Sequence, residues 1–194
     1  LKDLDVNYTV GIDEAAFYGP KLDIQIRNVH GKEDTLITIQ IDQMLAEQFG
    51  MEYVDEDGSK RRPYIIHRTS LGCYERTLAL LIEKYAGAFP LWLAPEQVRV
   101  LPISERQAEA VKAVAERLKA AGLRTEVDLR SEKIGYKIRE AQVQKVPYML
   151  VIGDKEAESG TVSVRSRREG DVGVQSVDDF LARALREVAE KVIW

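Results

Sequence analysis

The chain has 194 residues, a length that fits one large or two small globular domains, and 45% of the residues are hydrophobic and 31% charged. Its formal net charge of −4 gives no overall signal for nucleic-acid binding. No apolar run approaches the roughly 20 residues of a membrane span, and the N-terminus lacks the basic and apolar regions of a secretion signal, so neither a membrane protein nor a secreted one is expected. The single cysteine excludes an intramolecular disulfide and fits the cytoplasm.

The first half is predicted to form an antiparallel sheet followed by one helix. Strand-like stretches cover residues 6–12, 21–29, 36–41 and 64–66, with a turn at E-D-G-S (56–59). From Gly72 to Tyr85 the apolar residues recur with a helical period. One sheet with one helix is too little to close a core, and the chain opens on Leu1, so we expect a piece of a longer protein.

A domain boundary is expected at residues 91–95, where two prolines bracket Trp92, and it divides the chain into domains of residues 1–92 and 93–194. The second half alternates strands and helices, which predicts a three-layer α/β domain with a mixed sheet of about five strands. The expected strands are 98–103, 123–129, 147–152 and an exposed or edge strand at 161–166; the expected helices are 105–121, capped by Ser104 and closed by Gly122, 133–144 and 177–192.

The segment Y-I-I-H-R-T-S-L-G-C-Y-E-R at 64–76 holds the densest group of reactive side chains. It places His67 where a strand gives way to a helix that carries Arg76, and such junctions often form small-molecule sites in α/β proteins. Two structural alternatives remain open. A lone histidine is commonly satisfied by hydrogen bonds, and Arg76 could form a surface ion pair with Glu75 or Asp42.

Charge is unevenly distributed along the chain. Residues 1–95 carry a net charge of −5, whereas residues 96–194 carry +1. The cations of the second half cluster as Arg130, Lys133, Lys137, Arg139 and Lys145, and again as Arg165, Arg167 and Arg168. Solvated helix faces are one interpretation, and a local contact surface for phosphates is the other.

Six motifs, in chain order, resemble threonyl-tRNA synthetase, a class II aminoacyl-tRNA synthetase. They are A-F-Y-G-P-K (16–21), I-H-R-T-S-L-G-C-Y-E-R (66–76), W-L-A-P-E-Q-V (92–98), E-K-I-G-Y-K-I-R-E (132–140), V-P-Y-M-L-V-I-G-D-K-E (146–156) and V-R-S-R-R (164–168). The resemblance implies the last part of the class II antiparallel catalytic sheet with its motif 3 helix, followed by an α/β anticodon-binding domain. Motifs 1 and 2 would lie outside this chain. Synthetases for proline, glycine or histidine share the second-domain architecture, but I-H-R favours the threonine enzyme.

The resemblance also implies an activity for the parent protein. It would activate threonine with ATP and magnesium, transfer threonine to tRNA(Thr), and act in the cytoplasm as a homodimer. Catalysis of this kind needs positioning and electrostatics rather than a protein nucleophile. We expect this chain alone to be inactive, and its oligomeric state is left open. The alternative is a non-catalytic tRNA- or RNA-binding module with a remnant of the synthetase sheet.

Site residues in the first half follow from the same resemblance. Arg76 corresponds to the motif 3 arginine, a catalytic and ATP-binding residue, because a fixed guanidinium stabilises charge on phosphate oxygens. Cys73 would lie beside the nucleotide, although many relatives have serine there and a thiol is a weaker donor. The positions implied for threonine binding are Tyr18, Lys21 and Gln40, with Gln40 alternatively just part of a polar strand face.

His67 corresponds to one of three protein ligands of a zinc ion that reads the amino and hydroxyl groups of threonine. The chain is not expected to complete this zinc site. In the second half, the positions implied for anticodon recognition are Ser131, Lys133, Glu156 and Arg165. Carboxylates and guanidinium groups suit the edges of unpaired bases, and Gly153 is expected to permit the turn into the base-reading loop.

Overall fold

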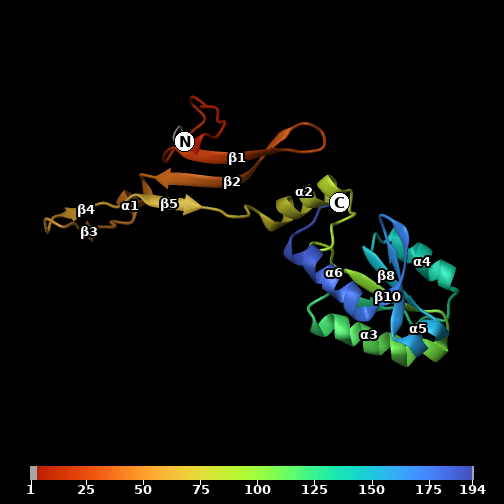
Figure 1. Cartoon of the computed structure of the whole chain (residues 1–194). Coiled ribbons are helices and arrows are strands. Elements are labelled where there is room, and N and C mark those ends of the chain that lie inside the picture. The colour runs from red at the N-terminus through yellow and green to blue at the C-terminus, as the bar shows by residue number, and fades with distance from the viewer. Residues whose placement is uncertain (1–3, 194) are drawn as a thin grey trace. The chain divides into compact units, whose positions relative to one another are not determined.

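The computed structural model describes residues 4–193, and the chain divides into two units between Leu80 and Leu81 (Figure 1). The expected domain boundary between residues 92 and 93 stays a prediction. Among residues 4–193, no helix is both long enough and apolar enough to cross a bilayer.

The first unit is built on a three-stranded antiparallel sheet. Its strands are β1 (Lys21–Arg27), β2 (Glu33–Asp42) and β5 (Ile65–Arg68), in the order β1-β2-β5. The short helix α1 (Leu45–Gln48) and the hairpin of β3 (Tyr53–Val54) and β4 (Lys60–Arg61) lie between β2 and β5 in sequence, and α2 (Tyr74–Tyr85) follows β5. The three sheet strands and the helix confirm the sequence pattern.

The prediction of a strand at residues 6–12 is wrong. The structure pairs this segment with no other described strand, and Val10 and Ile12 are 72% and 76% exposed. A segment with alternating apolar and polar residues forms a strand only where a neighbouring strand pairs with its main-chain N–H and C=O groups. On β1 the apolar side chains of Leu22 and Ile24 are exposed as well. The first unit therefore presents a large apolar surface to solvent.

The second unit contains a five-stranded mixed sheet, as predicted. Its order is β10-β9-β8-β6-β7; β6 pairs in parallel with β7 and β8, and the remaining pairs are antiparallel. The strands are β6 (Val98–Pro102), β7 (Thr125–Val127), β8 (Tyr148–Ile152), β9 (Thr161–Ser166) and β10 (Gly170–Ser176). The helices are α3 (Ala108–Ala120), preceded by a 3-10 turn (Glu105–Gln107), then α4 (Ile134–Val143), α5 (Asp154–Ser159) and α6 (Val177–Ala189).

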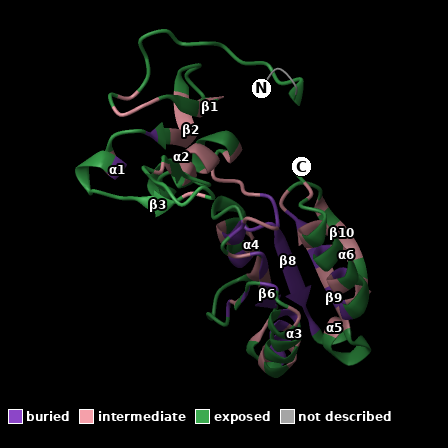
Figure 2. Ribbon diagram, turned by 90° about the vertical axis from the view of Figure 1, so that its left-hand side faces the viewer, coloured by how far each residue is buried: buried purple, intermediate pink, exposed green. Residues whose placement is uncertain are grey.

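Helices cover both faces of this sheet, which confirms the three-layer prediction. On one face α3 and α6 bury Leu118 and Phe180 against strand residues such as Leu150. On the other face α4 packs Ala141 against Met149 and its neighbours. Figure 2 shows the buried strand β8 between α4 and α6. Both hydrophobic clusters of the described chain lie in this unit, so it has a core of its own.

The outer part of the sheet differs from the prediction. β9 was expected to be exposed or at an edge, but it pairs with both β8 and β10, and its Val162 and Val164 are fully buried. The edge strand on this side of the sheet is β10, which the sequence pattern did not predict because Gly170 and Gly173 interrupt it. Helix α5 was also missed, since six residues are too few to establish a helical period.

Candidate functional site

Three predicted site residues form a row across the sheet of the first unit. Lys21 on β1 is the register partner of Gln40 on β2, and Gln40 is the partner of His67 on β5. Residues opposite one another in neighbouring strands point to the same face. Tyr18, from the loop before β1, donates its hydroxyl hydrogen to Gln40 Oε1 at 2.7 Å, and its ring lies edge-on to His67 with centroids 6.3 Å apart. The structure therefore brings the predicted threonine and metal residues together.

Charged groups on this face are paired with one another. Lys21 donates to Asp23 Oδ2 at 2.7 Å, and Thr38 donates its hydroxyl hydrogen to the other oxygen of Asp23 at 2.8 Å. The hydrogen bond to Asp23 raises the pKa of the Lys21 ammonium above its usual value. An ammonium, an imidazole, an amide and a phenol on one face offer the polar contacts that a small hydroxylated amino acid needs.

Asp42 is the buried partner of His67, and sequence reasoning had not connected the two. Its Oδ2 lies 3.0 Å from His67 Nε2, and its Oδ1 accepts from the amides of Met44 and Leu45 at 2.9 Å each. The pKa of Asp42 is lowered, chiefly by the Leu45 amide, against the opposing effect of burial, with the His67 contact adding to it. Residues 4–193 contain no group of three histidine, cysteine or acidic residues that could hold a metal. His67 with its carboxylate neighbour thus fits one ligand position of a metal site, and zinc stays a prediction.

The start of α2 holds the predicted nucleotide residues. Gly72 has φ of +65° and approaches β2 so closely that a Cβ there would lie 2.4 Å from the Leu36 carbonyl oxygen. Arg76 Nη1 donates to the Thr35 carbonyl oxygen at 3.2 Å, and Cys73 Sγ donates to Glu75 Oε2 at 2.8 Å. Glu75 is thus engaged by the thiol, and the described ion pairs contain none between Arg76 and either Glu75 or Asp42.

The two groups of residues lie along one strand. Thr35, which holds Arg76, and Gln40, at the centre of the row, are five residues apart on β2, or roughly 17 Å at about 3.4 Å per residue. The first unit therefore holds an arginine near one end of β2 and the row of polar side chains near the other.

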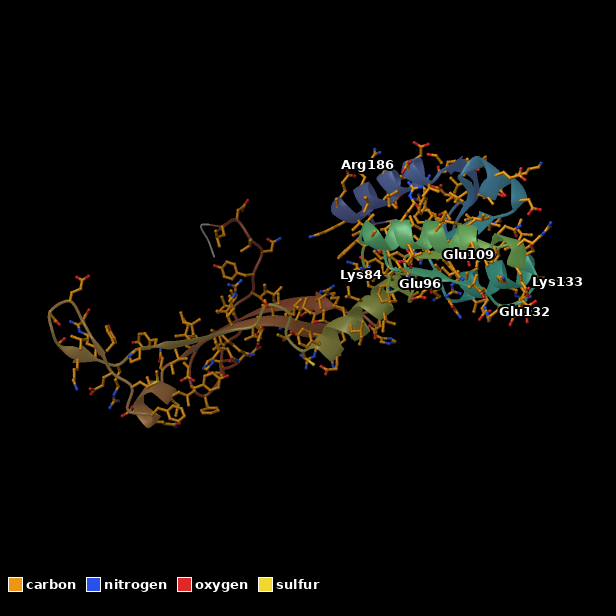
Figure 3. All side chains as sticks on the ribbon, turned by 90° about the horizontal axis from the view of Figure 1, so that it is seen from below. Lys84, Glu96, Glu109, Glu132, Lys133 and Arg186 are labelled. Atoms are coloured by element: carbon orange, nitrogen blue, oxygen red, sulfur yellow. The ribbon has the colours of Figure 1, made fainter. Side chains whose placement is uncertain are left out.

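A crevice of about 610 Å³ opens in the second unit at the carboxyl ends of β6 and β7. Its walls are the loop after β6, residues 102–106, and the loop after β7, residues 129–133, with Lys137 of α4 beneath. The chain leaves β6 toward β7 and then crosses to β8 on the other side, and such switch points are common binding sites. Two predicted residues, Ser131 and Lys133, line the crevice. Figure 3 shows Glu132 and Lys133 at one end of this unit.

An ion-pair network holds the loop after β7. Asp128 accepts from Arg130 Nε at 2.9 Å and Nη2 at 2.7 Å, and Arg130 Nη2 also contacts Glu140 Oε2 at 2.6 Å. These hydrogen bonds from Arg130 keep the pKa of Asp128 below its usual value. Lys137 is 3% exposed and donates to the Asp128 carbonyl oxygen at 3.1 Å. The interpretation of Lys137 as part of a solvated or phosphate-contacting face is therefore wrong.

The other predicted anticodon residues do not line the crevice. Glu156 Oε2 accepts a hydrogen bond from the Gly153 amide at 2.9 Å. Glycine is needed at position 153, because a Cβ there would lie 2.8 Å from Ile103 Cδ1 and 2.9 Å from Glu156 Oε2. Ile103 is a wall of the crevice, and Gly153 lies against it. Arg165 on β9 donates to its cross-strand partner Asp171 at 3.0 Å.

Sequence reasoning missed the wall that precedes α3. Ser104 and Arg106 line the crevice, and Arg106 reaches Asp154 Oδ2 at 3.2 Å. Gln107 donates to the same carboxylate, so the loop after β6 is tied to the start of α5. The available signal was position alone, since loops at the carboxyl ends of parallel strands commonly carry sites.

Comparisons with known proteins agree with this architecture. A family model described as "tRNA synthetase class II core domain (G, H, P, S and T)" matches residues 4–85, and one described as "Anticodon binding domain" matches residues 97–187. The threonine–tRNA ligase of Clostridium perfringens strain SM101 is 60% identical over 191 residues, which are 98% of this chain and 30% of that protein. The corresponding ligase of Clostridium acetobutylicum is 50% identical over 192 residues, 99% of this chain and 30% of that protein.

A solved structure is also similar. The crystal structure of the RNA binding domain of threonyl-tRNA synthetase from Cryptosporidium parvum Iowa II matches with a TM-score of 0.83 and 34% identity, covering 95% of this chain and 47% of that one. The present chain spans 30% of the length of the curated relatives it matches. Its two matched regions and its sequence identity place it in the threonyl-tRNA synthetase family.

Proposed function

We propose that this chain is the C-terminal part of a threonine–tRNA ligase that activates threonine with ATP and transfers it to tRNA(Thr) in the cytosol. The observation that carries the proposal is the row of Lys21, Gln40 and His67 across three strands, with Tyr18 bonded to Gln40. This face provides the donors and acceptors that distinguish a hydroxylated amino acid from an apolar one of the same shape.

The residues of the first unit would bind and orient rather than react covalently. In adenylation the threonine carboxylate attacks the α-phosphate of Mg-ATP and pyrophosphate leaves, so negative charge develops on phosphate oxygens. Arg76, held on the Thr35 carbonyl oxygen, would place a guanidinium against that charge, and Cys73 would lie beside the nucleotide. His67 would hold a zinc ion together with ligands from outside this chain, and a bound zinc would supply a Lewis-acidic centre for the amino and hydroxyl groups of threonine.

The second unit would recognise the anticodon of tRNA(Thr). Ser131 and Lys133 line a crevice large enough for an unstacked base, and its loop is held in place by the Asp128–Arg130 ion pair. Glu156 and Arg165 would contact bases outside the crevice, because carboxylate and guanidinium groups match the donor and acceptor edges of bases.

This chain by itself is proposed to lack aminoacylation activity. The exposed apolar side chains of the first unit, such as Phe17 at 86% and Tyr74 at 78%, would be covered by the rest of a catalytic domain, and the whole protein would act as a homodimer. A second candidate is an RNA-binding module without catalysis, which the self-contained core of the second unit favours.

Binding of tRNA tests the recognition part of the proposal. Affinities of the 194-residue chain for tRNA(Thr) and for an anticodon-swapped variant would be measured at two salt concentrations. A preference for tRNA(Thr) that the swap removes supports an anticodon reader, whereas equal and steeply salt-dependent binding indicates phosphate contact alone. Threonine-dependent pyrophosphate exchange by this chain above background would overturn the proposed inactivity.

A further inference from the structure

The His67 ring faces a carboxylate that is far more buried than the ring itself. The side chain of Asp42 is 2% exposed, whereas that of His67 is 43% exposed. Burial of a carboxylate is costly unless hydrogen bonds satisfy its oxygens. Asp42 meets this requirement with the amides of Met44 and Leu45 on Oδ1, and with His67 on Oδ2.

Strand register fixes this arrangement. Gln40 lies opposite His67, and Asp42 is two residues further along β2 on the same face, so it is a diagonal neighbour of the ring. The two main-chain amides hold the carboxylate, which therefore presents one oxygen to β5. The Tyr18 ring contacts the imidazole edge-on and restricts its plane. Both orientation and partner of His67 are thus set by ordered elements.

We infer that Asp42 is a positioning residue that fixes the neutral His67 ring with its hydrogen on Nε2 and the lone pair of Nδ1 available as a ligand atom. An ionised carboxylate only accepts hydrogen bonds, so the ring nitrogen facing Asp42 Oδ2 must carry hydrogen. In a neutral imidazole the other nitrogen then has the lone pair, and a carboxylate behind a ligand histidine is a recurrent arrangement. The ligand role of Nδ1 rests on the proposed function, whereas the tautomer does not.

Nitrogen NMR of the 194-residue chain, labelled with 15N-histidine, tests the tautomer without any metal. The chain has two histidines, so exposed His30 is an internal reference for His67. At a pH where both rings are neutral, we expect the Nε2–H form of His67 to predominate. Its minor tautomer should be about tenfold less populated than that of His30, which corresponds to one charge-assisted hydrogen bond. Equal tautomer ratios at the two residues, or hydrogen on Nδ1 of His67, would overturn the inference.

Substitution of Asp42 distinguishes the effect of its carboxylate on the His67 tautomer from the effect of the other residues around the ring. In Asp42→Asn the amide group can donate to Nε2, and the minor tautomer of His67 is expected to rise about tenfold. The matched control is Asp23→Asn on the neighbouring strand of the same face, which should leave both His67 nitrogen signals unchanged. If Asp42→Asn disrupts the sheet, the comparison of His67 with His30 in the unsubstituted chain still tests the tautomer.

A titration with Zn²⁺ distinguishes this inference from the proposed function. A shift confined to Nδ1 of His67 supports both, and a shift at Nε2 contradicts the positioning by Asp42. No effect of Zn²⁺ on a ring that keeps the Nε2–H form would uphold the inference about Asp42 and agree with a zinc site whose other ligands lie outside this chain.

Discussion

Arg167 donates a hydrogen bond of 2.8 Å to the main-chain oxygen of Phe89, which joins the residue after β9 to the first segment of the second unit. The same guanidinium donates to the oxygens of Ala88 at 3.1 Å and of Lys145. Burial lowers the pKa of Arg167. A residue from the cationic V-R-S-R-R segment therefore serves the fold, since it fixes three carbonyl groups at once.

Replacement of Arg167 should destabilise the second unit. In Arg167→Met the carbonyl oxygens of Ala88 and Phe89 lose their donor, and we expect a loss of about 2–3 kcal/mol in the free energy of unfolding. Urea denaturation of the 194-residue chain measures this change. The exposed neighbour Arg168, changed to Gln, is the control and should shift stability by less than about 0.5 kcal/mol. Equal effects of the two substitutions would contradict the structural role of Arg167.

The Asp128–Arg130 pair predicts a pH dependence of stability. The folded state lowers the pKa of Asp128, so its stabilising contribution is complete above the unfolded pKa of about 3.9 and is lost as pH falls through the folded value. The stability difference between wild type and Asp128→Asn should therefore be largest near pH 7 and shrink below about pH 4. Urea titrations at several pH values measure it. Glu109→Gln, at an exposed surface pair, is the control and should show little difference at any pH.

Lys137 and Lys133 should affect tRNA binding differently. Lys137→Met removes the donor to the Asp128 carbonyl oxygen beneath the crevice, and we expect discrimination between tRNA(Thr) and an anticodon-swapped tRNA to fall. Lys133→Gln removes an exposed cation that would contact phosphates of the anticodon loop, so it should weaken the binding of both tRNAs equally, with a salt dependence reduced by about one contact. Loss of discrimination in Lys133→Gln alone would reverse these assignments.

Gly153 and Gly135 should respond to alanine with opposite signs. In Gly153→Ala the new Cβ would crowd Ile103 Cδ1 and Glu156 Oε2, and we expect a destabilisation of about 1–3 kcal/mol. Adding Ile103→Val removes the crowded methyl group and should restore part of the loss. Gly135 lies in α4 with nothing within 4 Å of an added Cβ, so Gly135→Ala should stabilise by roughly 0.5–1 kcal/mol. Thermal denaturation of the three variants and the unchanged chain compares their stabilities, and a neutral Gly153→Ala would contradict the close packing.

Arg76 should matter for adenylation in the longer protein. Arg76→Ala removes the guanidinium held at Thr35 and is expected to lower threonine-dependent pyrophosphate exchange on the order of 100-fold. Arg62→Ala, which breaks only an exposed pair with Glu47, is the control and should leave the rate within about twofold. An unchanged rate in Arg76→Ala would remove Arg76 from the nucleotide site.

Local sequence pattern was sufficient for most elements of the second unit. Five elements lie within a few residues of their predicted positions: α3, α4, α6, β6 and β8. A short stretch of sequence is enough to show a helical or a strand period of apolar residues. The motifs also led to the family, and therefore to the candidate residues. Elements without a clear period, α5 and β10, were missed.

Long-range pairing accounts for what the pattern did not determine. The row of Lys21, Gln40 and His67 depends on the register of β1 with β2 and on the pairing of β2 with β5, which lies well beyond it in the sequence. Register is set by hydrogen bonds between strands. The interior place of β9 and the burial of Lys137 likewise depend on neighbours that pack in the folded chain. A sequence period records which side of an element is apolar, whereas only the assembled sheet determines which carboxylate meets which histidine.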